Sequence, residues 1–187
     1  MHYTLCDMFS DLTQNSIEAG ADTITVDIEQ TETSVSCCIE DNGKGMSPEQ
    51  LKRATDPFYT DGIKHPHRKV GLGIPFLIQT AEETGGTWSI TSDVTDNGKG
   101  APGTRISCSF DLTNIDTPPV GDVTGFFRQI LTFPGSYEMI ITREAPGFGY
   151  TVRRSDLLEA LGLQDQGEFA DANALSLLGQ YLESLED

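Results

Sequence analysis

Apolar residues recur along the first part of the chain with the spacing of a helix, and then with the spacing of strands. The residues on the helical stripe are Leu5, Met8, Phe9, Leu12 and Ile17. This stripe predicts a helix over residues 4–19, which Gly20 would end. Alternation of apolar and polar side chains predicts a half-buried strand over residues 23–30. A second apolar run at 35–39 follows a polar turn, so we expect the two strands to form a hairpin.

Glycine, proline and capping residues divide the rest of the chain into further elements. Ser47 and Gln50 match a capping-box pattern, which predicts a short helix that begins near Pro48. The Thr-Pro-Pro run at 117–119 indicates a boundary, so we divide the chain into a domain over 1–115 and an extension over 120–187. The other expected elements are helices at 74–83, 123–131, 155–161 and 171–185 and strands at 87–91, 105–112, 137–142 and 150–153.

The last expected helix carries a leucine stripe. Its members are Leu175, Leu178, Leu182 and Leu185, which share one helical face. We expect this stripe to pack on the rest of the protein or on a second copy of the chain, so the extension is a candidate surface for a homodimer. The extension shows no residue pattern that indicates chemistry.

Composition limits the class of protein. Apolar residues make up 37% of the 187 residues, which is enough for a core. We find no run long enough to span a membrane and no signal peptide, so we expect a cytoplasmic protein without a membrane partner. The four cysteines form no Cys-x-x-Cys pair, which favours reduced core thiols over a metal site.

The formal net charge of -17 argues against nucleic acid as a main partner, because the phosphate backbone is also negative. The same charge makes any cluster of cations informative. One such cluster occurs, and it consists of Lys64, His65, His67, Arg68 and Lys69.

The clearest candidate for chemistry follows the second strand. Asp41 lies at the strand tip, where we place it because a lone carboxylate inside the strand core would be costly. Gly43 and Gly45 permit close backbone approach, and Met46 adds a soft apolar surface. A carboxylate beside an apolar surface suits an adenine ring, whose amino group donates and whose faces are apolar. An ordinary surface turn is the alternative, since Asp-Asn-Gly is common in hairpins.

Two polar residues of the first helix form a second candidate. Asp11 and Asn15 are four positions apart and therefore project from one helical face. Their oxygen atoms are of the kind that magnesium prefers. A solvated polar face explains the same pair without a metal.

A long loop and a glycine pair form the third candidate. Residues 55–70 have no clean periodicity and contain the cation cluster. Gly71, Leu72 and Gly73 then enter a helix, where bare backbone N–H groups can meet an anion. A second Asp-Asn-Gly-Lys-Gly, at 96–100, has no apolar strand before it and no methionine after it, so we interpret it as a turn.

Taken in order, these motifs resemble the GHKL superfamily, the ATP-binding fold of histidine kinases, gyrase B, ninety-kilodalton heat-shock chaperones and MutL. The motifs are Asp11-x-x-x-Asn15, Asp41-x-Gly43-x-Gly45, Gly71-x-Gly73 and Gly103-Thr104. Residues 15–21 look most like MutL, and residues 56–60 look most like the F box of histidine kinases. The resemblance covers roughly residues 5–112.

The resemblance implies a fold and a set of roles. The fold is the Bergerat fold, a two-layer α/β sandwich of a mixed, mostly antiparallel sheet with helices on one face, here with a small α/β C-terminal extension. Asp41 would accept from the adenine amine, Thr104 would support the same edge, and Asn15 would bind magnesium through ATP or ADP. Residues 55–73 would form a mobile ATP lid. Implied phosphate contacts are Lys69, Gly71, Leu72 and Gly73, and implied pocket residues are Gly43, Gly45 and Met46.

Two departures from the family pattern shape the expected function. Asp11 stands where hydrolysing members have glutamate, so its reach as a general base is shorter by one methylene. Orthodox histidine kinases carry a phosphoacceptor histidine before this domain, whereas His2 is the one histidine that precedes Asp11 here. We therefore expect a magnesium-dependent ATP-binding protein with slow hydrolysis at most, which signals to an unidentified protein partner. The alternatives are a protein kinase acting in trans and an interaction module without chemistry.

Overall fold

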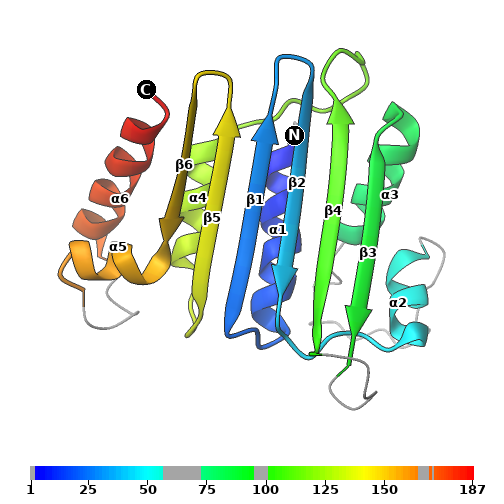
Figure 1. Ribbon diagram of the computed structural model, residues 1–187, viewed down its shortest axis with the longest axis horizontal. Coiled ribbons are helices and arrows are strands. Elements are labelled where there is room, and N and C mark those ends of the chain that lie inside the picture. Colours follow the sequence, from blue (N-terminus) through cyan, green and yellow to red (C-terminus); the bar gives the residue numbers. More distant parts are fainter. Residues whose placement is uncertain (1–2, 57–72, 95–100, 164–168, 170) are drawn as a thin grey trace.

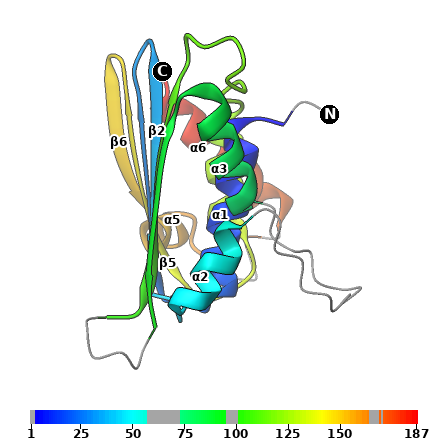
Figure 2. The same cartoon turned by 90° about the vertical axis from the view of Figure 1, so that its right-hand side faces the viewer.

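The computed structural model describes residues 3–56, 73–94, 101–163, 169 and 171–187. Within these residues six strands form one sheet in the order β3-β4-β2-β1-β5-β6, and helices cover one of its faces (Figures 1 and 2). This two-layer α/β arrangement confirms the predicted fold class. The elements are α1 Leu5–Glu18, β1 Thr23–Gln30, β2 Ser34–Asp41, α2 Pro48–Thr55, α3 Gly73–Thr84, β3 Thr87–Asp93, β4 Gly103–Asp111, α4 Val123–Thr132, β5 Glu138–Ala145, β6 Phe148–Arg153, α5 Arg154–Ala160 and α6 Ala172–Leu185.

The strand pairing makes the sheet mixed. β1 and β2 form the expected antiparallel hairpin, in which Val26 lies opposite Ile39. β5 joins β1 in parallel, with Ile24 opposite Met139, and the remaining neighbours pair antiparallel. Alternation along β1 buries Ile24 and Val26 beneath the helices and leaves Asp27 exposed on the open face of the sheet.

The helix ends follow local sequence signals. Thr4 caps α1, and its hydroxyl accepts from the backbone N–H of Asp7 at 3.1 Å. The predicted capping box of Ser47 and Gln50 is present at the start of α2, with Pro48 at its first position. Such reciprocal caps satisfy backbone donors that a helix cannot pair itself.

The C-terminal region contributes to the same core as the rest of the chain. Leu178 and Leu182 of α6 are fully buried, as the leucine stripe predicts. Phe126 of α4 packs against Phe9 of α1, with ring centroids 6.2 Å apart. The backbone N–H of Leu5 donates to the carbonyl oxygen of Pro119 at 2.9 Å, so the boundary segment is bonded to the start of α1. The division of the chain into 1–115 and 120–187 stays a prediction.

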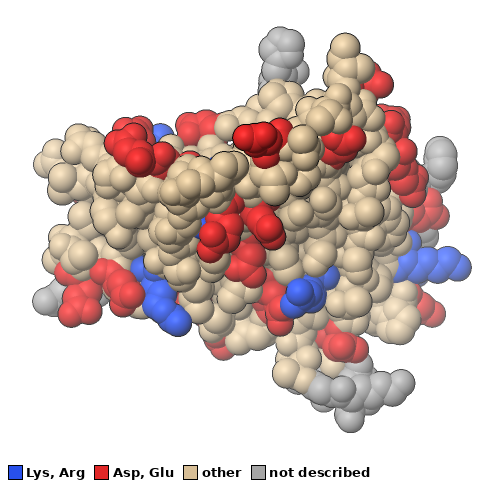
Figure 3. Space-filling model, turned by 45° about the horizontal axis from the view of Figure 1, so that its top comes forward, with Lys and Arg blue, Asp and Glu red and all other residues tan. Residues whose placement is uncertain are grey.

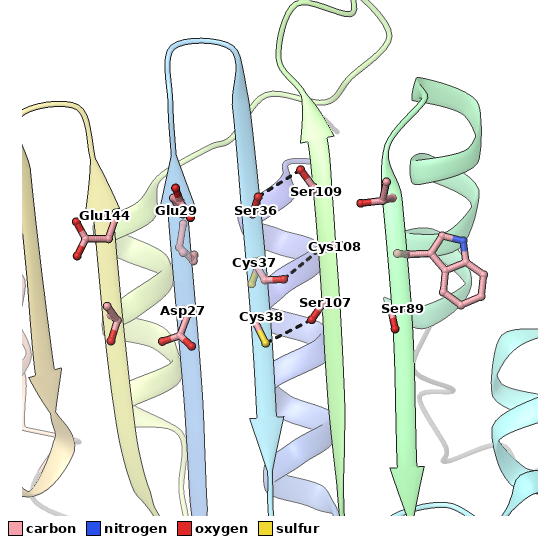
Figure 4. Close-up of a pocket in the computed structure, with 14 residues that line it drawn as sticks. Asp27, Glu29, Ser36, Cys37, Cys38, Ser89, Ser107, Cys108, Ser109 and Glu144 are labelled. Atoms are coloured by element: carbon pink, nitrogen blue, oxygen red, sulfur yellow. Dashed lines mark hydrogen bonds between the residues drawn. The ribbon is translucent and has the colours of Figure 1, made fainter.

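The face of the sheet opposite the helices is polar. A depression of about 460 Å³ on this face is lined by small hydroxyl side chains and by Asp27, Glu29 and Glu144 (Figure 4). The hydroxyl of Ser36 donates to that of Ser109 at 3.2 Å. Groups of acidic side chains are spread over the surface in Figure 3, and Lys and Arg are sparse there. Because these carboxylates would repel phosphate groups, this face of the sheet is unsuited to binding an anion.

None of the helices in the described part of the chain is both long enough and apolar enough to cross a membrane.

Candidate functional site

The carboxylate of Asp41 is the centre of a buried polar contact at the end of β2. Only 9% of the residue is exposed. The hydroxyl of Ser16 donates to Oδ2 at 2.6 Å, and the backbone N–H of Gly43 donates to Oδ1 at 2.9 Å. The predicted position at the strand tip is correct, but the side chain is more buried than expected. The two hydrogen bonds explain the difference, because a carboxylate with partners is far less costly to bury than a lone one.

Ser16 was not among the site residues predicted from the sequence. This residue lies on the buried face of α1, in line with Leu5, Phe9 and Leu12 at helical spacing. A hydroxyl on an otherwise apolar helical stripe requires a partner, and this pattern was the signal that could have revealed it.

A cavity of about 240 Å³ lies beside Asp41, between α1, the start of α3 and the start of β4. Its apolar walls come from Leu12, Met46, Ile74 and Ile106, and its polar lining includes Asn15, Asp41 and Thr104. A flat aromatic ring with an amino group at one edge fits this chemistry, because the walls accept its faces and Asp41 accepts its N–H. Each carboxylate oxygen of Asp41 keeps a second lone pair after its protein contact.

Thr104 of β4 lines one side of this cavity, and a hydroxyl of β3 holds it. Thr104 lies opposite Asp41 in the register of β2 and β4. The Oγ1 of Thr104 lies 2.7 Å from the Oγ of Ser92. The hydroxyl oxygen of Ser92 also accepts a hydrogen bond from the backbone N–H of Met46 at 2.7 Å. Ser92 therefore ties the Met46 segment to the strand that carries Thr104. No pattern in the sequence pointed to Ser92, because its partners lie on other elements.

Glycine is required at Gly45 by both conformation and space. Its φ is 69°, and a Cβ atom there would collide with the carbonyl oxygen of Asp93. Gly43 is also confined, since a Cβ would come within 2.9 Å of the Cβ of Ala19. These close approaches bring the backbone after β2 against α1 and β3, and so form the floor of the cavity.

Gly45→Ala is expected to lower the free energy of unfolding by more than Gly85→Ala does. Both glycines have positive φ, of 69° and 72°, but a Cβ at Gly85 would meet nothing within 4 Å. Gly85→Ala should therefore cost about 1–2 kcal/mol of backbone strain, whereas the clash at Gly45 should add about 1–3 kcal/mol. Urea unfolding monitored by circular dichroism measures both. Equal costs would mean that the segment after β2 shifts freely.

The candidate magnesium residues lie on the neighbouring part of α1. Asn15 is half-buried and lines the cavity, whereas Asp11 is exposed. The phenol of Tyr3 donates to Oδ2 of Asp11 at 3.1 Å. Burial, and then the charge of Asp11, raises the pKa of Tyr3 well above its usual value, so the phenol keeps its proton. Gly73, the first residue of α3, packs so closely on α1 that a Cβ would lie 3.3 Å from the Cβ of Asp11.

The structure brings most of the described candidates together around one cavity. These are Asn15, Asp41, Gly43, Gly45, Met46 and Thr104, with Asp11 and Gly73 beside them. Lys69, Gly71 and Leu72 lie outside the described residues, as does the proposed lid from residue 57 to residue 72. The individual roles of all these residues in binding stay predictions.

Comparison with known proteins identifies the family. Residues 3–114 match the sequence model of the family described as histidine kinase-, DNA gyrase B- and HSP90-like ATPase. Because this match covers more than half of the chain, the protein belongs to that family, which confirms the GHKL assignment.

Two curated relatives are named as kinases. The chain is 29% identical over 99 residues to a putative sensor histidine kinase NtrY-like protein of Rickettsia conorii, covering 53% of this chain and 14% of that protein. It is 30% identical over 99 residues to sporulation kinase C of Bacillus subtilis, covering 52% of this chain and 22% of that protein. The matched segment is thus a minor part of each relative.

A solved structure shares the fold. The crystal structure of the N-terminal domain of a DNA repair protein aligns with a TM-score of 0.52 and 16% identity, covering 80% of this chain and 51% of that one. At this identity the likeness concerns the fold alone.

Proposed function

We propose that this protein binds ATP and ADP in the cavity beside Asp41. The observation that carries the proposal is the buried carboxylate of Asp41, held by Ser16 and Gly43 at the edge of an apolar cavity. Such a fixed acceptor matches the amino group of adenine, and the family assignment of residues 3–114 supports the same ligand. The test is isothermal titration calorimetry with ATP and ADP in the presence of magnesium.

The triphosphate would extend from this cavity toward the start of α3. Asn15 lines the cavity and would hold magnesium between its side-chain oxygen and the phosphates. Lys69, Gly71, Leu72 and Gly73 would meet the phosphates themselves. The helix N-terminus at Gly73 favours negative charge there.

Asn15→Ala should remove most of the gain in ATP affinity that magnesium provides, because the variant lacks the metal-binding oxygen. Calorimetry with and without magnesium measures this gain. Gln14→Ala is the matched control, since Gln14 is an exposed neighbour on α1 that bonds to Glu18. If Asn15→Ala keeps the full magnesium effect, Asn15 belongs to a polar helix face without a ligand.

Slow hydrolysis at most is the expected chemistry. A general base must come within hydrogen-bond reach of the attacking water. Asp11 has a short side chain, and its carboxylate already accepts a hydrogen bond from Tyr3. Both features weaken it as a base for water. Release of inorganic phosphate, measured over hours with purified protein, tests this expectation.

A signalling role through a protein partner completes the proposal, with a kinase acting in trans as the second candidate. Both curated relatives are named as kinases, which favours that candidate. Labelled phosphate from ATP that appears on a co-purified protein would identify a kinase. Phosphate release that changes with the partner, without transfer to it, would identify a signalling ATPase. Nucleotide binding without either activity would leave an interaction module.

A further inference from the structure

Among the described residues, no strand pairs with the outer edge of β6. β6 ends the sheet order, and a two-residue turn of Pro146 and Gly147 joins it to β5. Ala145 lies opposite Phe148 at this turn. In such a hairpin the pair next to the turn is hydrogen-bonded, and bonded and non-bonded pairs then alternate. The backbone groups that point away from β5 therefore belong to Gly149, Thr151 and Arg153.

On the open face of the sheet, a carboxylate and a guanidinium group lie on either side of Thr151. The carboxylate of Glu144 leans over the α-carbon of Gly149, where a Cβ would collide with it. Glu144 therefore presents its charge toward the outer side of β6, and Figure 4 shows its side chain on the open face. Arg153 is exposed two residues after Thr151. Among the described residues no ion pair engages its guanidinium.

We propose that two copies of this chain join antiparallel at β6 and so form one continuous sheet across a two-fold axis. The axis would pass beside Thr151, which then pairs with Thr151 of the second copy. This register uses the three residues whose backbone groups point outward. It also sets Gly149 opposite Arg153 of the second copy, so that each Arg153 meets the Glu144 that leans over Gly149. An isologous interface requires this self-complementarity.

The helix side of the same edge supplies an apolar surface. A groove of about 390 Å³ runs between β6, α5 and α6. Two large side chains of α6 line it while remaining solvent-exposed, Leu177 at 53% and Tyr181 at 45%. Figures 1 and 2 show α6 beside β6 on the helix-bearing side of the sheet. The second copy would place its own α6 against this surface and remove apolar area from water.

A single register pairs the outward-pointing backbone groups of the two β6 strands and also brings opposite charges together. The same arrangement would cover the apolar surface of α6. These three features together favour a second copy over an unrelated peptide. Nothing in this proposal depends on nucleotide binding. It can therefore fail while the proposed function stands, and the reverse also holds.

Sedimentation equilibrium of the full chain tests the proposal, at protein concentrations of about 1–100 µM that bracket ordinary micromolar affinities. A dimer is expected for the wild type. Arg153→Glu and Glu144→Arg should each weaken dimerisation about tenfold or more, because like charges then face each other. The double variant should restore the wild-type dimer.

Two further variants separate the charges from the backbone pairing. Thr151→Pro removes the N–H beside the axis and should give a monomer, while a melting temperature by circular dichroism verifies its fold. Lys52→Glu and Glu32→Arg are matched controls, since both are exposed charges far from β6 in the chain and should leave the dimer unchanged.

A wild type that stays monomeric over this range would overturn the proposal. A dimer that persists in folded Thr151→Pro and in both single charge variants would also overturn it.

Discussion

Asp41→Asn is expected to weaken ATP binding by about 1.5–3 kcal/mol, which corresponds to roughly 10- to 150-fold. The carboxylate accepts from Ser16, from Gly43 and, in our proposal, from the adenine amine. A carboxamide has one oxygen in place of two, so one of these donors would face an N–H₂ group. Because the adenine contact is a hydrogen bond to a charged group, its loss should be among the largest that a single substitution can cause here.

Calorimetric titration of ATP into the variant measures this effect. Asp27→Asn is the control, because it makes the same chemical change on the exposed face of β1. The melting temperature of both variants separates lost affinity from a damaged fold. An Asp41→Asn protein that is folded and binds ATP within twofold of the wild type would remove Asp41 from the site.

A chain that ends at Pro119 is expected to lose its cooperative fold. The truncation removes β5, which pairs with β1 over seven positions, and α4, which packs on α1. It also removes buried side chains, among them Phe126, Phe127, Ile130, Leu131, Met139 and Ile141. Each such side chain contributes about 1.5–3 kcal/mol when buried, and a whole domain is stable by only about 5–15 kcal/mol.

Thermal unfolding and limited proteolysis of the truncated chain measure this loss. The matched control is a chain that ends at Ala160, which keeps α4, β5 and β6 but lacks α6. It should retain a melting transition at a lower temperature, since Leu178 and Leu182 would be missing from the core. A chain ending at Pro119 that stays soluble and monomeric and melts like the full protein would instead support an independent domain over 1–115.

The local parts of the fold were predictable because local sequence determines them. The alternating pattern over residues 23–30 matches β1, and the capping box at Ser47 marks the start of α2. The parallel pairing of β5 with β1 was not predictable in this way, because it joins segments more than a hundred residues apart and no pattern within β5 specifies its neighbour. The Pro-rich segment at 117–119 gives no local sign that β5, which follows it, joins the same sheet as β1.

The candidate site shows the same distinction. Asp41, Gly43 and Gly45 could be proposed from one short motif, since the strand tip and the glycines lie together in sequence. Ser92 could not, because it acts from β3 on β4 and the Met46 segment. Ser16 stands out on the apolar stripe of α1 as a hydroxyl that needs a partner, but nothing local identifies Asp41 of β2 as that partner. Their roles depend on tertiary neighbours.

Comparison of ATP with GTP in the wild-type protein tests the central claim most directly, namely that Asp41 recognises adenine. Guanine has a carbonyl oxygen where adenine has its amino group, so two acceptors would face each other at Asp41. Calorimetry with magnesium present should give ATP an affinity about tenfold or more above that of GTP. Equal affinities for ATP and GTP, or the absence of binding by either, would contradict the account.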